Sequence, residues 1–226
     1  GPSDRREWAL LAACGADLPG LISVLLDDPK ATPLGRVAEG AKRLQRAHIQ
    51  PDSLHALPYT AQDLAEFSAR RGFTCSLASD EHCAPAIYSR KESAFKLVSH
   101  NASYQLTLES EGRIGAVENQ RLTSQLAKDA GIAVQTVGRV LAADGVPVLW
   151  AERLDRSGAS NCQRLRLESA CQLLGNAAGT EGESLESIAK LIRQYCTNPK
   201  VQLLRLFQRV VFGWLAGNGG LDMSKW

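Results

Sequence analysis

The stretch ENQRLTSQLAKDAGIAVQTVGRVLAADGVPVLWA, residues 118–151, decides the fold, because the spacing of its apolar residues changes partway along. Its first part, 118–130, predicts a helix, and Gly131 suits the left-handed cap that ends many helices. The rest holds two apolar runs, 137–141 and 146–151, on either side of an Asp-Gly pair that is typical of a tight β-hairpin turn. We therefore expect a helix followed by a hairpin.

The same stretch allows a rival interpretation. Residues 124–141 resemble a helix-turn-helix, in which Gln135, Thr136 and Arg139 would reach base edges of DNA. The strand-like segment 144–150 argues against it, and so does a net charge of only +2, since DNA-binding proteins usually carry a basic excess. A helix in place of the expected hairpin would support this alternative.

Upstream segments predict more of the same small sheet. Residues 104–108 alternate between apolar and polar side chains, as a half-buried strand does, and 84–99 predict a hairpin around the polar turn 89–93. Residues 60–70 predict a helix whose first residue is an N-cap three positions before Asp63. We expect the helix at 118–130 to pack against this sheet.

From residue 163 onward the pattern predicts helices. Ser184 is placed to cap a helix with one apolar face. The next helix, 201–216, is apolar nearly all round, which favours a place in the centre of a lobe. We therefore expect Phe207 and Trp214 to be buried.

Composition bounds the class of protein. The chain has 226 residues, of which 44% are hydrophobic and 22% charged, as in ordinary globular proteins. These values exclude a disordered tail, a collagen-like fibre and a disulfide-dense mini-protein. The sequence contains no apolar run long enough to predict a membrane span.

The six cysteines form no C-x-x-C pair, so we expect reduced and mostly buried thiols in a cytoplasmic protein. Cys75, His82, Cys83 and His100 could in principle supply zinc ligands, but their spacing fits no familiar zinc module. We predict no metal site.

Eight segments, in order, resemble the HipA-type serine/threonine kinases of bacterial toxin–antitoxin systems. They are DLPG at 17–20, FTCSLA at 73–78, YQLTL at 104–108, ENQ-x5-LAKDAGI at 118–132, AERLDR at 151–156, CQLLG at 171–175, SLESIAKLI at 184–192 and FGWLAGN at 212–218. The resemblance implies an α+β, protein-kinase-like fold of two lobes, a small mixed sheet followed by a mainly helical lobe. This sequence retains apolar residues at the positions of the family's scaffold, namely Leu126, Ile132, Leu154, Leu173, Ile188 and Trp214. In that family the helix at 118–130 leads into a sheet hairpin and does not read DNA.

The resemblance divides the chain into four parts. They are a tag-cleavage scar at 1–3, an N-terminal helical and loop segment at 4–72, a sheet-containing N-lobe at 73–160 and a truncated helical C-lobe at 161–226. The family's small N-terminal subdomain and its last helices are not matched. We therefore expect either a fragment or a fold completed by a partner.

The family's catalytic positions are degenerate in this sequence. Its strand lysine falls on Thr107, its helix glutamate on Gln120, its catalytic aspartate on Gly220 and its metal-binding asparagine on Lys225. A protein kinase needs these four side chains to hold ATP and magnesium and to position the attacking hydroxyl. Their loss predicts a pseudokinase; in the alternative of an active kinase, Asp222 would serve as a displaced catalytic aspartate.

Parts of the nucleotide site are retained. The resemblance implies phosphate-loop contacts at Ser76 and Ser79, although Ser79 replaces the family's glycine and two acidic residues follow it. Glu152 to Leu154 match the hinge that contacts adenine, which makes Glu152 and Leu154 candidates for weak ATP binding. No other cofactor is expected.

These observations predict a HipA-like pseudokinase that acts as a binding or regulatory module of toxin–antitoxin ancestry. Its partner would be a HipB-like antitoxin or repressor, or a missing part of its own fold, with no membrane and no direct nucleic-acid contact. The alternatives are a divergent but active serine/threonine kinase toxin, and a DNA-binding regulator that uses residues 124–141.

Overall fold

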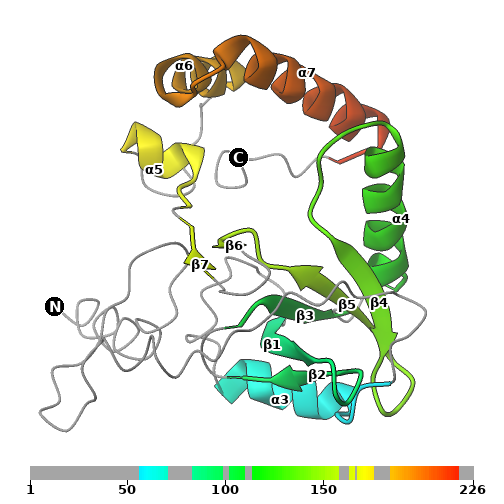
Figure 1. Cartoon of the computed structure of the whole chain (residues 1–226). Coiled ribbons are helices and arrows are strands. Elements are labelled where there is room, and N and C mark those ends of the chain that lie inside the picture. Colours follow the sequence, from blue (N-terminus) through cyan, green and yellow to red (C-terminus); the bar gives the residue numbers. More distant parts are fainter. Residues whose placement is uncertain are drawn as a thin grey trace, which may run out of the picture. The chain divides into compact units, whose positions relative to one another are not determined.

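The computed structural model describes residues 56–70, 83–98, 102–109, 114–157, 163–165, 167–175 and 184–218. The chain divides into two compact units (Figure 1). Unit 1 comprises residues up to Leu122 together with Gln135–Arg166, and unit 2 comprises Thr123–Val134 and Leu167–Trp226. The described sheet lies in unit 1, and the helices of the C-terminal third lie in unit 2.

Unit 1 is built on a five-stranded sheet with strand order β2-β1-β3-β5-β4. The strands are β1 (Cys83–Ser89), β2 (Ala94–Leu97), β3 (Tyr104–Leu108), β4 (Val137–Leu141) and β5 (Pro147–Glu152). The expected α+β class and both expected hairpins are confirmed. All the described pairs are antiparallel, however, where we expected a mixed sheet. Short turns close two of these pairs, and such turns can join only antiparallel neighbours.

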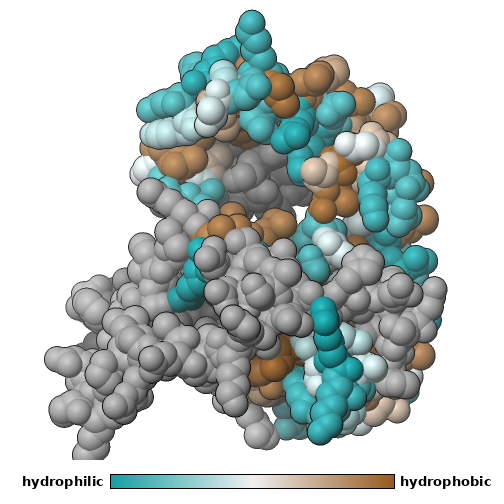
Figure 2. Space-filling model, in the orientation of Figure 1, coloured by the Kyte–Doolittle hydropathy of each residue, from teal (hydrophilic) through white to brown (hydrophobic). Residues whose placement is uncertain are grey.

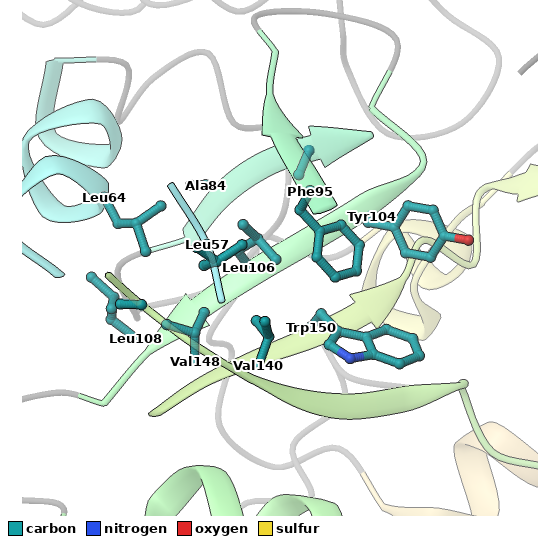
Figure 3. Packing of buried hydrophobic residues seen from close by; sticks show 12 residues of the cluster. Leu57, Leu64, Ala84, Phe95, Tyr104, Leu106, Leu108, Val140, Val148 and Trp150 are labelled. Carbon is teal, nitrogen blue, oxygen red and sulfur yellow. The ribbon is translucent and has the colours of Figure 1, made fainter. Parts of the chain in front are cut away.

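One face of the sheet forms the core of unit 1 (Figure 3). Its buried residues are Leu57, Leu64, Ala84, Ala86, Phe95, Tyr104, Leu106, Leu108, Val140, Ala142, Val148 and Trp150. The ring centroids of Phe95 and Tyr104 lie 5.3 Å apart, and those of Phe95 and Trp150 lie 5.8 Å apart. Such aromatic contacts stabilise a fold beyond the area that they bury.

Helix α3 (Ala61–Arg70) covers this face, through Leu64 and the preceding Leu57. We had expected the helix at 118–130, here α4 (Ala116–Asp129), to pack against the sheet. The core cluster contains no residue of α4, whose Leu122 and Leu126 are 54% and 52% exposed. Few of its residues are large and apolar, so α4 has little to bury against a sheet face.

Local signals fix the start of α3 and the end of α4, as expected. The backbone N–H of Asp63 donates to the Thr60 hydroxyl over 3.1 Å, and the N–H of Thr60 donates back to the Asp63 carboxylate over 2.8 Å. This reciprocal cap begins α3, and it holds the pKa of Asp63 below its ordinary value. Gly131 follows α4 with φ 75°, the left-handed conformation predicted for it.

The hairpin β4–β5 excludes the helix-turn-helix interpretation. Residues 137–141 form a strand paired with β5, and the turn between the strands uses Gly145 with φ 81°. Gln135, Thr136 and Arg139 therefore do not lie on a recognition helix.

Unit 2 contains α5 (Ala170–Leu174), α6 (Leu185–Tyr195) and α7 (Pro199–Leu215). Ser184 is the N-cap of α6, as predicted. The buried residues Ala170, Ile188 and Leu191 form the small core of unit 2, and Leu206 of α7 packs against it.

Strands β6 (Arg156–Ser157) and β7 (Gln163–Arg164) pair as a short antiparallel ribbon. This ribbon differs from expectation, since we predicted helix from residue 163.

The expected burial of α7 is wrong. Phe207 is 65% exposed and Trp214 is 79% exposed, and Figure 2 shows hydrophobic residues reaching the surface over α7. Of the retained apolar scaffold, Ile188 is buried, whereas Leu154 is 62% exposed. An apolar helix is buried all round only where neighbours cover it on every side, and among the described residues α6 covers α7 on one side.

Within the described ranges, no helix is long and apolar enough to cross a membrane.

Gly138 packs closely against the indole of Trp150. A Cβ at this position would lie 2.5 Å from the indole of Trp150, which is 1% exposed. We expect Gly138→Ala to lower the free energy of unfolding by about 1–3 kcal/mol, through overpacking. Urea denaturation of Gly138→Ala, Trp150→Phe and the double variant measures this, because the smaller ring should relieve the clash. Strictly additive effects of the two substitutions would contradict it.

The exposure of α7 predicts a contrast in stability. Phe207→Ser and Trp214→Ser should each change the free energy of unfolding by no more than about 0.5 kcal/mol, as surface substitutions do. Ile188→Ala, in the core of unit 2, should lower it by about 2–5 kcal/mol. Denaturant midpoints of the three variants make the comparison. A loss at Trp214 as large as that at Ile188 would place Trp214 in a core.

Candidate functional site

The sheet has a second face, opposite the aromatic core. By strand alternation and register it carries Cys83, Pro85, Gln105, Thr107, Leu149 and Ala151 in its central strands. Thr107 lies on this face, at the position where the kinase resemblance places a lysine. We therefore take the second face as the candidate site. A phosphate-binding site needs positive charge, so the question is whether this face carries a free cation.

Thr107 lies in the middle of the sheet, paired with Cys83 on β1 and with Leu149 on β5. Its side chain is buried, and its hydroxyl lies 3.6 Å from the Cys83 thiol. The Gln105 side-chain amide donates to the same sulfur over 2.7 Å. The centre of the second face is thus lined by neutral groups that interact with one another.

The cations of the second face lie at its two edges. Lys96 on β2 contacts Glu92 over 2.7 Å, and Arg139 on β4 contacts Glu118 over 2.5 Å. Glu118 also accepts from Arg121, and these two arginines hold its pKa below the ordinary value. Among the described residues of this face, each edge cation is therefore already paired with a carboxylate.

Gln120 does not restore a charge near this face. It lies exposed on α4, and only the sequence resemblance assigns it to a glutamate position. The nearby carboxylate of Glu118 is engaged with Arg139 and so joins the first turns of α4 to β4. The N–H of Val117 donates to Glu109 over 3.2 Å and joins the same turns to the end of β3. These contacts attach the first turns of α4 to the sheet.

The hinge residues are only partly available to a ligand. The backbone N–H of Glu152 donates to the carbonyl of Thr136 over 2.9 Å, and its carbonyl accepts from the Gln135 side chain. Both backbone groups of Glu152 are thus used inside the sheet. The other candidate, Leu154, has an exposed side chain.

A buried ionic cluster directly follows Glu152, and the sequence pattern did not lead us to expect it. Asp155 accepts from the Arg153 guanidinium over 2.9 and 2.7 Å and also from Arg156, and all three residues are 2% exposed. The Asp155 carbonyl accepts from the N–H of Leu165, next to β7. The signal was present as R-x-D-R within AERLDR. Buried charges persist where they are paired in this way, so we assign the cluster a role in holding the chain after β5.

The remaining candidate positions are not brought together. Ser76, Ser79, Gly220, Asp222 and Lys225 lie outside the described residues. Of the zinc candidates the described part includes Cys83 alone, and it contains no group of three His, Cys, Asp or Glu side chains that could hold a metal ion. Cys83 and Cys171 are buried and not disulfide-bonded, as expected for reduced thiols.

Comparison with known proteins identifies what this architecture is similar to. A sequence model of the family described as the HipA-like C-terminal domain matches residues 95–220. Among solved structures, the chain is similar to one from the Shewanella oneidensis MR-1 toxin–antitoxin complex of HipA, HipB and operator DNA. The TM-score is 0.62 and the identity 22%, covering 96% of this chain and 52% of that chain. The chain thus spans about half the length of this structural relative. No curated protein matches it.

The neutral second face predicts that a lysine is poorly tolerated there. Thr107→Lys would place an ammonium beside the Cys83 thiol in a buried site. We expect the free energy of unfolding to fall by about 3 kcal/mol. Thr107→Val, the control, should cost about 1 kcal/mol, because it removes only the hydroxyl.

Urea denaturation of both variants checks the comparison. A Thr107→Lys protein as stable as the unmodified chain would show that this face can hold a charged lysine, as an ATP site must.

Proposed function

The chain belongs to the HipA-like C-terminal domain family, and we propose that it is a catalytically degenerate member that binds a protein partner without transferring phosphate. The observation that supports this proposal is the burial of Thr107 beside the Cys83 thiol, at the position that the resemblance assigns to the ATP-binding lysine of a kinase.

Phosphoryl transfer depends on positive charge placed against the phosphates before the reaction begins. Lys96 and Arg139 are each paired with a glutamate at the edges of the second face. Recruiting either cation to a nucleotide would break an existing ion pair. We therefore assign the second face no role in ATP binding.

The contacts of Glu152 also argue against tight ATP binding. Adenine would have to compete for the backbone groups of Glu152 with Thr136 and Gln135, which already satisfy them. Any nucleotide binding is expected to be weak and independent of magnesium.

The proposed ancestry is a toxin–antitoxin system, since the structural relative comes from a complex of HipA with HipB and operator DNA. We propose a protein partner for this chain and not DNA, because residues 137–141 form a sheet strand in place of a recognition helix. The unbridged thiols of Cys83, Cys171 and Cys196 are compatible with a cytoplasmic location.

Incubation with radiolabelled ATP and magnesium tests the absence of catalysis. We expect no label on the chain or on an added aminoacyl-tRNA synthetase, the substrate class implied by the resemblance. Gly220→Asp should remain inactive, because Thr107 and Gln120 would still lack the charges that the reaction needs. An active HipA-type kinase in parallel shows that the assay works.

Label incorporated by the unmodified chain would overturn the proposal. If Asp222→Asn then abolished that signal, the chain would be a divergent kinase that uses Asp222.

A further inference from the structure

The side chain of Gln135 reaches across the end of the sheet. Gln135 is half-buried and lies two positions before β4, and its amide donates to the carbonyl of Glu152, the last residue of β5. Both residues belong to unit 1. The helix-turn-helix interpretation would have directed this side chain at DNA, whereas the structure engages it with the backbone of its own sheet.

The two backbone groups of Glu152 are held in different ways. Its N–H donates to the carbonyl of Thr136 over 2.9 Å, which continues the pairing of β4 with β5. The following N–H, of Arg153, donates to the carbonyl of Ser103 over 2.9 Å, so the backbone is held from both sides. The Glu152 carbonyl, in contrast, accepts from a side chain, which can leave by changing rotamer while the backbone pairing stays intact. One contact of Glu152 is therefore part of the sheet, and the other is displaceable.

We propose that Gln135 is an autoinhibitory contact, whose amide occupies the carbonyl that the amino group of an adenine ring would use. The inference rests on the proposed function, in which Glu152 is a candidate contact for weak adenine binding, and it names what blocks that contact. The carboxamide nitrogen of glutamine and the exocyclic amine of adenine are both planar NH2 donors, so each suits a backbone carbonyl. A second donor at this oxygen would lie close to the Gln135 amide, and the two therefore compete.

The same contact defines which bases can compete. Adenine carries an amine at the position where hypoxanthine carries a carbonyl oxygen. An oxygen facing the Glu152 carbonyl would bring two acceptors together with no donor between them, which costs free energy. Removal of the Gln135 amide should therefore favour the amino-substituted purine.

The test compares adenosine with inosine, which differ in this amine and carbonyl and carry no phosphate. Binding of each radiolabelled nucleoside to the full chain and to Gln135→Ala is measured by equilibrium dialysis. We expect Gln135→Ala to bind adenosine about tenfold more tightly than the unmodified chain, the effect of one freed hydrogen bond. Inosine should bind no more tightly to the variant than to the unmodified chain.

Two further variants separate release of the carbonyl from a general change of structure. Gln135→Glu keeps the length of the side chain but cannot donate when ionised, so it should also raise the affinity for adenosine. Gln125→Ala removes another glutamine contact, with Asp129 over 2.8 Å within α4, and should leave adenosine binding unchanged. Thermal melts establish that each variant is folded.

Adenosine binding that neither Gln135 variant improves would overturn the inference, and so would an equal gain for inosine or a gain in Gln125→Ala. These results are independent of the phosphate-transfer assay. Label on the unmodified chain would refute the proposed function without changing the effect of Gln135 on nucleoside binding. Unimproved adenosine binding would refute the autoinhibitory contact and leave the absence of catalysis standing.

Discussion

Trp150 packs on the bare backbone of Gly138 and against the ring of Phe95, and this contact fixes the arrangement of unit 1. Trp150 lies on β5 and Gly138 is its register partner on β4, so only a residue without a Cβ fits opposite the indole. Phe95 extends the contact to β2 and Tyr104 extends it to β3. A slip of one residue in β5 would turn Trp150 away from these rings and toward the second face.

The fixed register also determines what the second face can do. With Trp150, Leu106 and Ala84 held on the core side, their neighbours Leu149, Thr107 and Cys83 must lie on the other side. The central strands therefore bring a thiol, a hydroxyl and aliphatic groups together at the centre of the second face. The scaffold is that of the family, but the chemistry of its centre is that of a packed protein interior.

The two helices that the hydrophobic pattern singled out show opposite outcomes. Helix α6 has one apolar face, and that face supplies Ile188 and Leu191 to the core of unit 2. Helix α7 is apolar on two sides and is covered by α6 on one, so Phe207 and Trp214 remain at the surface. The amount of apolar surface on a helix predicts how much it can bury, and the available neighbours decide how much it does bury.

The sequence by itself determined the elements whose signals are local. The Asp-Gly pair placed the turn between β4 and β5, Thr60 and Asp63 placed the start of α3, and Gly131 placed the end of α4. Each of these residues acts through backbone conformation or a hydrogen bond within a few positions, so no distant contact is needed to predict it. The resemblance of the surrounding motifs also singled out Thr107 and Gln120, whose assignment as catalytic positions stays a prediction.

Only the tertiary structure decided which surfaces meet. The choice of α3 over α4 for the core, the pairing of Arg139 with Glu118, and the use of Glu152 by Gln135 and Thr136 all join residues distant in sequence. Such contacts depend on competition between surfaces for the same neighbour, and a one-dimensional pattern records each surface without its competitors. The exposure of α7 follows from the same cause, since burial is a property of a helix together with what surrounds it.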